Sequence, residues 1–210
     1  MLGRQPTMDA AAVRQASKVL VNFFDSVLAL ASKPSFTSTG EAAGNNGQVV
    51  INMFYYAPKD KALSDSAINS VGKVLSKLFN ARVELRLVRL HYPYLNSYIL
   101  AQYIAINTAK YNFTRIISRL WGANIIFSAP VQQQSRKDNV LAVTSNSAPT
   151  SYIKGVKVKV SGRLVTQRSV PRKTVETAQT GTFSNSRVDS ASFTSKNKKG
   201  AFTVKVWISL

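Results

Sequence analysis

The stretch Ile153-Lys-Gly-Val-Lys-Val-Lys-Val-Ser-Gly-Arg-Leu164 decides the fold of the second half of this 210-residue chain. Three valines in it alternate with Lys157, Lys159 and a serine, which is the period of a strand with one apolar and one charged face. Glycines bracket this strand. Gly155 lets the chain enter from a turn, and Gly162 leaves room for close backbone approach, a common device where a partner lies against a protein.

A matching strand closes the chain. Its residues from Phe202 to Ser209 alternate between apolar side chains and the polar or amphipathic Thr203, Lys205 and Trp207. We expect both strands to belong to one sheet. For either strand alone, the better interpretation would be an ordinary half-buried sheet whose lysines only keep the protein soluble.

The charge of the chain changes that interpretation. Lys and Arg number 28 against 9 Asp and Glu, a net charge of +19. The segment 151–210 holds twelve basic and two acidic residues, so it carries +10 of that charge. Such a charge costs self-repulsion, which a dense polyanion offsets most simply. Nucleic acid is therefore the first expected partner, and an anionic membrane surface is the second.

Composition also argues against several classes of protein. The chain has no cysteine, which excludes thiolate metal sites and thiol catalysis and fits a reducing or organellar interior. It has no run of about eighteen apolar residues, so we expect no membrane span. His91 is the only histidine, and Asp60 and Asp65 are the closest useful pair among scattered carboxylates. We predict no enzyme, no catalytic residue, no metal site and no cofactor, with a nuclease as the alternative.

The amino-terminal part reads as helix, strand, helix, strand. Apolar residues recur every three or four positions over 9–31, run nearly continuously over 48–56 and alternate over 81–90. Ser64 is placed to cap the helix between the two strands. The polar residues 33–47 read as a loop or linker.

A strand, a helix and a strand around a glycine loop form the core of an RNA-binding KH domain, in which a G-x-x-G loop clamps the nucleic-acid backbone. That loop is missing here. At its place stands Ala57-Pro-Lys-Asp-Lys-Ala62, with two lysines and no glycine, and Gly44-Asn-Asn-Gly47 matches the pattern but precedes the strand. We therefore expect only a degenerate KH-like domain over residues 1–92.

Two further helices are expected after this domain. Pro93 is well placed at the first turn of one, and Asn112 can cap a second that runs to Trp121. Aromatic residues near arginines could stack nucleic-acid bases. Because these aromatics share the apolar face of the helix, core packing is the better interpretation. The weakly patterned residues 122–150 read as an insertion loop.

The two carboxy-terminal strands resemble a known family. Gly155-Val-Lys-Val-Lys-Val-Ser-Gly-Arg-Leu164 followed by Gly200-Ala-Phe-Thr-Val-Lys-Val-Trp-Ile208 is similar to the carboxy-terminal domain of small-subunit ribosomal protein S-three. Three further stretches resemble its fungal mitochondrial members: Thr166-Gln-Arg-Ser-Val-Pro-Arg-Lys-Thr174, Gly181-Thr-Phe-Ser-Asn185 and Leu90-His-Tyr-Pro-Tyr-Leu-Asn-Ser-Tyr-Ile99. The resemblance covers about 81–210, and over 9–80 it rests on element order alone.

This resemblance implies an α+β fold. A degenerate KH-like domain of the second type would occupy residues 1–92. The α/β carboxy-terminal domain of the S-three type, two helices packed on a mainly antiparallel sheet, would occupy 93–210, with the insertion loop at about 122–150.

The resemblance also implies a function. The chain would be a structural constituent of the mitochondrial small ribosomal subunit, in the mitochondrial matrix. It would bind rRNA of the subunit head, help to line the channel through which mRNA enters, and adjoin head proteins of the S-ten and S-fourteen types. The alternative is a basic nucleic-acid-binding protein or nuclease outside the ribosome.

Individual residues follow from charge and from the resemblance. The residues expected to bind rRNA are Lys154, Lys157, Lys159, Arg163, Arg168, Arg172, Lys173, Lys196, Lys198 and Lys199. By resemblance, Arg115 and Arg119 lie where the family faces incoming mRNA, whereas Thr114 and Ser118 depart from its basic pattern. We expect the Ser- and Thr-rich segment 166–195 to be a loop that orders fully only against rRNA.

Overall fold

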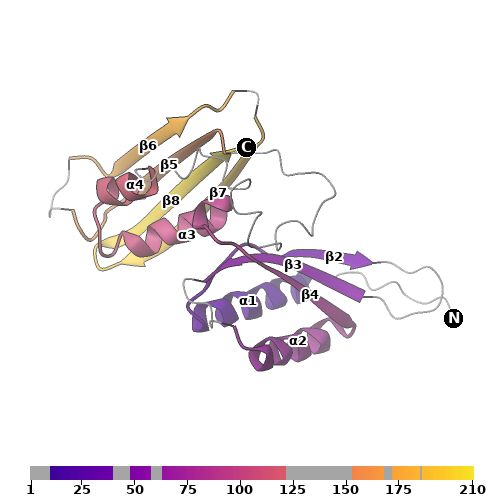
Figure 1. Ribbon diagram of the computed structural model, residues 1–210. Helices are drawn as coiled ribbons and strands as arrows, with labels where there is room; N and C mark the ends of the chain where they lie inside the picture. The colour runs from indigo at the N-terminus through magenta and orange to yellow at the C-terminus, as the bar shows by residue number, and fades with distance from the viewer. Residues whose placement is uncertain (1–9, 40–47, 58–62, 122–152, 168–171, 185) are drawn as a thin grey trace. The chain divides into compact units, whose positions relative to one another are not determined.

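The computed structural model describes residues 10–39, 48–57, 63–121, 153–167, 172–184 and 186–210. The chain divides into two compact units, Met1–Pro93 and Tyr94–Leu210. Each unit combines helices with one sheet (Figure 1). The predicted α+β class is therefore confirmed.

In the first unit, β3 is the central strand of a four-stranded sheet. The elements are α1 (Ala10–Ser26), β1 (Leu30–Ala31), β2 (Ser35–Thr39), β3 (Gln48–Tyr56), α2 (Asp65–Phe79) and β4 (Arg82–Arg89). β1 and β2 pair with β3 in antiparallel fashion, while β4 pairs with it in parallel. A parallel pair requires a crossover, which α2 supplies. Both helices lie on the same face of the sheet (Figure 1).

The core of this unit lies between that face and the two helices. Leu20 and Phe24 of α1 and Leu75 of α2 are fully buried against Ile51 and Met53 of β3. As predicted, Ser64 caps α2, and its hydroxyl accepts a hydrogen bond from the backbone N–H of Ala67. The alternating apolar side chains of β3 and β4 thus pack against the helices on one face of the sheet, and no helix of the described residues covers the other.

The prediction of a loop over 33–47 is wrong for its first part, because Ser35–Thr39 forms β2. Main-chain pairing with β3 holds this polar segment, and Phe36 lies opposite Ile51 in the register. The Phe36 ring also packs 6.0 Å from that of Phe79. One aromatic contact and an available strand edge therefore outweigh a composition typical of loops. Both glycine-loop candidates lie outside the described residues, except for Ala57.

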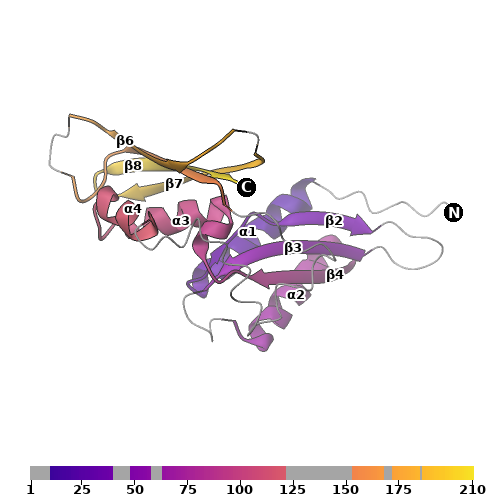
Figure 2. The same cartoon turned by 45° about the horizontal axis from the view of Figure 1, so that its top comes forward.

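The second unit is a four-stranded antiparallel sheet covered on one face by two helices. Its elements are η1 (Pro93–Leu95), α3 (Ser97–Asn107), α4 (Phe113–Trp121), β5 (Gly155–Gly162), β6 (Val175–Gly181), β7 (Val188–Asn197) and β8 (Gly200–Ser209). The strand order is β6-β5-β8-β7. Seen from the turned view, α3 and α4 lie side by side under the sheet (Figure 2). This is the predicted arrangement of the carboxy-terminal part.

The start of α3 differs from the prediction. Pro93 belongs to a short 3-10 turn, and the helix begins later, at Ser97. Asn96 is the cap, since its Oδ1 accepts hydrogen bonds from the N–H groups of Tyr98 and Ile99 at 3.0 and 3.1 Å. An asparagine that satisfies two helix-start donors fixes the helix boundary more firmly than a proline does.

The prediction of a loop over 166–195 is also wrong, because that segment contains β6 and most of β7. Both strands are edges of the sheet, so each needs only one partner strand, and one face of each meets solvent. Phe193 of β7 faces the helices and meets the ring of Tyr98 edge-on at 6.0 Å. Both strands are rich in small polar residues, so their composition in the sequence resembles that of a loop.

The glycines that bracket β5 serve the sheet itself. Gly162 has a φ of +118°, and a Cβ there would lie 2.7 Å from the carbonyl oxygen of Ala201. At Gly155 a Cβ would lie 2.6 Å from the carbonyl oxygen of Thr182. The close backbone approach at Gly162 is therefore made by β8 of the same chain and not by a partner, which corrects the prediction.

Candidate nucleic-acid interface

The strand register determines which side chains share the face of the second sheet that α3 and α4 do not cover. Lys157 of β5 lies opposite Trp207 of β8 and Gln179 of β6. Directly paired residues point to the same face of a sheet. We call this surface the outer face. Its described residues include Lys157, Lys159, Ser161, Thr177, Gln179, Ser190, Ser192, Thr194, Lys196, Thr203, Lys205 and Trp207, and the apolar Val175, Val188 and Ala201 share the same register.

Two lysines face each other at the centre of the outer face. Lys159 is paired directly with Lys205 across β5 and β8. Such cross-strand neighbours have Cβ atoms about 4.5–5.5 Å apart, and like charges there destabilise the sheet. A site that keeps this repulsion is suited to an anion that relieves it.

The two carboxylates of residues 151–210 lie on the opposite, helix-facing side. Asp189 pairs with the inward Ile208, and its Oδ2 accepts a hydrogen bond from the N–H of Ser97 at 3.1 Å. Glu176 pairs with the inward Val160 and accepts a hydrogen bond from Gln167 at 3.0 Å. Both negative charges are thus engaged in holding the fold, and the outer face as defined above has none.

The predicted rRNA-binding residues divide among three places. Lys157, Lys159 and Lys196 lie on the outer face, and Lys154 precedes β5 at one end of the sheet. A larger group gathers at the opposite end, where Gly162 bonds to Thr174 and β7 turns into β8. Its described members are Arg163, Arg172, Lys173, Lys198 and Lys199. Arg168 lies outside the described residues.

Two members of this end group also hold the protein itself together. The Nε atom of Arg163 is buried, and its carbonyl oxygen accepts a hydrogen bond from Asn197 at 2.7 Å. Lys199 donates through its ammonium group to the carbonyl oxygen of Gln167. Lys198 and Arg172 are exposed by contrast. Substitution of Lys199, whose side chain makes that hydrogen bond, or of Arg163, whose side-chain Nε is buried, would therefore change stability as well as charge.

Two residues of the outer face were not singled out from the sequence. Lys205 completes the charge on the face, and Trp207 places an indole ring beside it. The ammonium of Lys157 lies 5.8 Å from the centre of that ring. Alternation alone predicted that both residues point outward, but only the pairing of β8 with β5 brings them next to Lys157 and Lys159.

The residues expected to face mRNA lie on the exposed side of α4. Phe113, Ile116 and Ile117 are buried, as predicted from their spacing, whereas Arg115 and Arg119 are exposed. Both guanidinium groups stack on Tyr111, with Cζ atoms 5.0 and 5.6 Å from the ring centre. One tyrosine therefore orients two cations, which lowers the entropy that a bound phosphate must remove.

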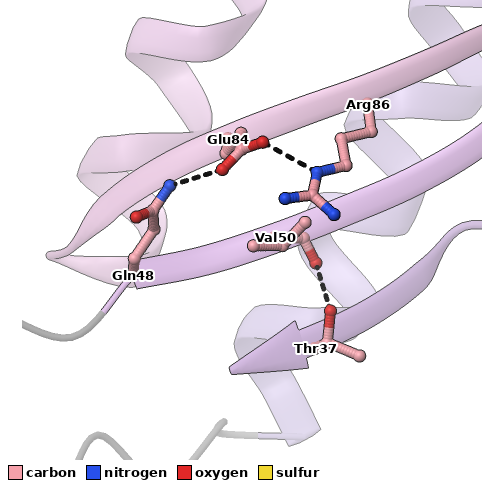
Figure 3. A network of polar contacts seen from close by, with 5 residues as sticks. All are labelled: Thr37, Gln48, Val50, Glu84 and Arg86. Atoms are coloured by element: carbon pink, nitrogen blue, oxygen red, sulfur yellow. Dashed lines mark hydrogen bonds and ion pairs between the residues drawn. The ribbon is translucent and has the colours of Figure 1, made fainter. Parts of the chain in front are cut away.

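The first sheet also has a face without helices, and there the central charges compensate one another. Glu84 accepts hydrogen bonds from Gln48 Nε2 and from Arg86 Nε, each at 2.7 Å (Figure 3). The hydrogen bond from Arg86 lowers the pKa of Glu84 below its usual value. Figure 3 also shows Thr37, whose hydroxyl donates to the carbonyl oxygen of Val50 at 3.3 Å.

Other kinds of site are not found in the part of the chain that the structure describes. No group of three or more His, Cys, Asp or Glu side chains there could hold a metal ion. Among the described helices, none is both long and apolar enough to cross a membrane. The outer face itself is basic and rich in hydroxyl groups, and it carries the aromatic ring of Trp207.

Comparison with known proteins finds similarity to mitochondrial ribosomal proteins. The family described as mitochondrial ribosomal protein (VAR1) matches residues 30–210. A relative from Mycosarcoma maydis, named small ribosomal subunit protein uS3m, is 34% identical over 201 residues. The match covers 84% of this chain and 66% of the relative, so this chain spans somewhat less than two thirds of that protein.

Proposed function

This chain belongs to the mitochondrial ribosomal protein (VAR1) family, and on that premise we propose that it is a structural component of the mitochondrial small ribosomal subunit that binds rRNA. The family is one of ribosomal proteins and not of enzymes. The relative's name refers to the small subunit, and it is this role that we transfer to the chain.

The observation that supports rRNA as the ligand is the outer face. Lys157, Lys159, Lys196 and Lys205 lie on it, and its described residues include no carboxylate. Lysine side chains on a strand face reach phosphate oxygens easily, and neighbouring Ser and Thr hydroxyls can donate to the same oxygens. Phosphate contacts of this kind hold a ribosomal protein on folded RNA with little dependence on sequence.

The finer proposal concerns the place in the subunit. We place the chain in the head, with residues 1–92 as a degenerate KH-like domain and 93–210 as the S-three carboxy-terminal domain. Its neighbours would be proteins of the S-ten and S-fourteen types. Support comes from the motifs around β5 and β8 and from the parallel pair β3 and β4 joined by α2.

The observation in favour of a contact with mRNA is the pair of arginines on α4. Arg115 and Arg119 project from the exposed side of the helix over Tyr111. A matched comparison tests this role: Arg115 and Arg119 both changed to Gln, against Lys73 and Lys77 of α2 both changed to Gln. The first variant should assemble normally but slow translation of structured mRNA. Normal translation by that variant would contradict the mRNA contact and leave the rRNA proposal standing.

Sedimentation tests the main proposal. A tagged chain expressed in mitochondria should migrate with the small subunit in high magnesium and dissociate in high salt, because phosphate contacts release counterions. The purified chain should bind small-subunit rRNA without cleaving it in the presence of Mg²⁺. Migration as a free protein, or metal-dependent cleavage of the RNA, would favour the alternative of a nuclease outside the ribosome.

A further inference from the structure

Trp207 lines a pocket on the outer face. Phosphate binding alone does not require a pocket with an aromatic lining. The pocket has a volume of about 400 Å³ and is lined by Lys157, Gln179, Phe183 and Trp207. That volume falls in the range of sites that hold small organic groups, ~300–1,000 Å³. The pocket is open to solvent, so a group attached to a long polymer can enter it.

The chemistry of the lining fits one kind of ligand group. Two aromatic side chains provide apolar surface, Gln179 is an exposed amide with both donors and an acceptor, and Lys157 supplies a positive charge. A nucleobase has an aromatic face, a hydrogen-bonding edge and a phosphate on either side. Aromatic stacking with a nearby cation is how proteins hold unpaired nucleotides.

From this geometry we propose that the outer face of the second unit captures one unpaired nucleotide of rRNA, with its base stacked on Trp207. This inference rests on the proposed function and adds that the RNA is single-stranded at this point. Gln179 contacts the edge of the base, and Lys157 and Lys159 contact the flanking phosphates. The partner is thus a loop or bulge of the RNA and not a regular duplex.

The position of Lys157 in the unbound chain allows a base to replace its ammonium group at the Trp207 ring. Its ammonium lies 5.8 Å from the Trp207 ring centre in the unbound chain. At this distance and partial exposure the cation–π attraction is weak compared with stacking of a base on the ring. The lysine can therefore move from the ring to a phosphate when a base enters.

The backbone around the pocket fixes its wall. Phe183 follows the tight contact between Gly155 and Thr182, and its Cε2 would lie 3.1 Å from a Cβ on residue 155. Gly181 takes a φ of +80°, and the N–H of Thr182 donates to the carbonyl oxygen of Lys154 at 3.0 Å. These constraints hold Phe183 at the rim, so the pocket exists before RNA binds.

Fluorescence of Trp207 tests the proposal directly. The chain has two tryptophans, so a Trp121→Phe background leaves Trp207 as the sole indole. The probes are a short single-stranded oligouridine and oligoadenosine, and an RNA duplex of the same length. We expect both single strands to quench the indole and the duplex to quench it little. Binding of the single strands without quenching would overturn the proposal, as would a protein occupant that excludes them.

Substitutions in the full chain give the second readout. Trp207→Leu should weaken single-strand binding roughly 5- to 160-fold, which corresponds to the loss of one stacked base, and leave duplex binding within about twofold. Trp207→Phe should retain most of the affinity. Equal losses for single strand and duplex, or no loss, would overturn the stacking site. Should Trp207→Leu fail to fold, Gln179→Ala, at an exposed position, must reduce single-strand binding and alter the preference between the two oligonucleotides, and its failure to do so would equally overturn the site.

These outcomes also separate the inference from the proposed function. Without salt-dependent binding of any RNA by the unaltered chain, the rRNA proposal itself fails. If the unaltered chain binds RNA and the Trp207 variants behave like it, only the stacking site fails.

Discussion

The two sheets of this chain are alike on the face that helices cover and differ in charge on the other face. Each is covered by two helices on one face. On the uncovered face of the first sheet, Glu84 is bonded to Arg86 and Gln48. On the outer face of the second, Lys159 lies opposite Lys205, and the nearby carboxylates Glu176 and Asp189 point to the helices.

This difference shows where a partner is needed. Charges at the centre of the first face are already compensated, so it can remain in water or meet a protein neighbour. The second face retains its repulsion, and an anion that lies across it gains both attraction and released counterions. Net charge alone does not make this distinction, since both units are basic.

The largest expected effect comes from removing the outer-face charge. Lys157, Lys159, Lys196 and Lys205 changed together to Gln should weaken binding of small-subunit rRNA by about 10³-fold near 0.1 M salt, because four phosphate contacts and their counterions are lost. The slope of log affinity against log salt should become shallower by about 3. Fluorescence anisotropy over a salt series measures both quantities.

A variant with the same change in charge elsewhere is the control. Arg14, Lys18, Lys73 and Lys77 are exposed cations on α1 and α2. Changing these four to Gln should cost much less affinity and alter the salt slope little. Equal losses in the two variants would mean that net charge, and not the outer face, determines binding.

The second prediction concerns a substitution that gives the outer face of the second sheet a compensated charge pair like that of the first sheet. Lys205→Glu places a carboxylate opposite Lys159, so repulsion becomes attraction and the free energy of unfolding should rise by a few tenths to about 1 kcal/mol. Binding to rRNA should fall by roughly tenfold or more, because one contact is lost and a negative charge is added. Urea unfolding and anisotropy should thus move in opposite directions. A variant that is both less stable and unimpaired in binding would refute the cross-strand argument.

Much of the fold could be predicted from the sequence, because two periodicities are strong in it. Three-four spacing gave α1 and α2, and strict alternation gave β4, β5 and β8 with their correct inward faces. The family was also predictable from the motifs around β5 and β8, and the family match confirms it, with the mitochondrion as its location.

The remainder depends on contacts that single-sequence patterns do not contain. β2, β6 and β7 are polar strands held by main-chain pairing along a sheet edge, so their composition resembles that of loops. The same reason explains the incomplete site. Lys205 and Trp207 were visible as outward residues, but strand register places them beside Lys157 and Lys159, and register is not readable from one strand. The ten predicted rRNA contacts stay predictions.

The third prediction concerns the carboxylate on the helix side. Asp189→Ala removes an acceptor for the first N–H of α3 and should lower the free energy of unfolding by about 1 kcal/mol. Affinity for rRNA should stay within about twofold, because the residue points away from the outer face, where one charge would otherwise matter. Asp189→Asn keeps an acceptor and should cost less stability. A clear gain in RNA affinity for Asp189→Ala would show that this carboxylate does influence the binding face.

The smallest expected effect tests the compensation in the first sheet. The hydrogen bond from Arg86 holds the pKa of Glu84 below its usual value, so the folded state binds this proton less readily than the unfolded state does. Stability from this group is therefore present above the usual glutamate pKa and is lost as pH falls through the lowered pKa. Because the pair is exposed, solvent screens it and the change in stability is slight.

Thermal unfolding measures this effect. From neutral to acidic pH, the unaltered chain should lose stability slightly more steeply than Glu84→Gln does. In an Arg86→Gln background, that difference should shrink, and rRNA affinity should remain the same in all four proteins of this cycle. If Glu84→Gln instead strengthened RNA binding as much as Lys205→Glu weakens it, the first face would also be a binding face, and the contrast between the two sheets would fall.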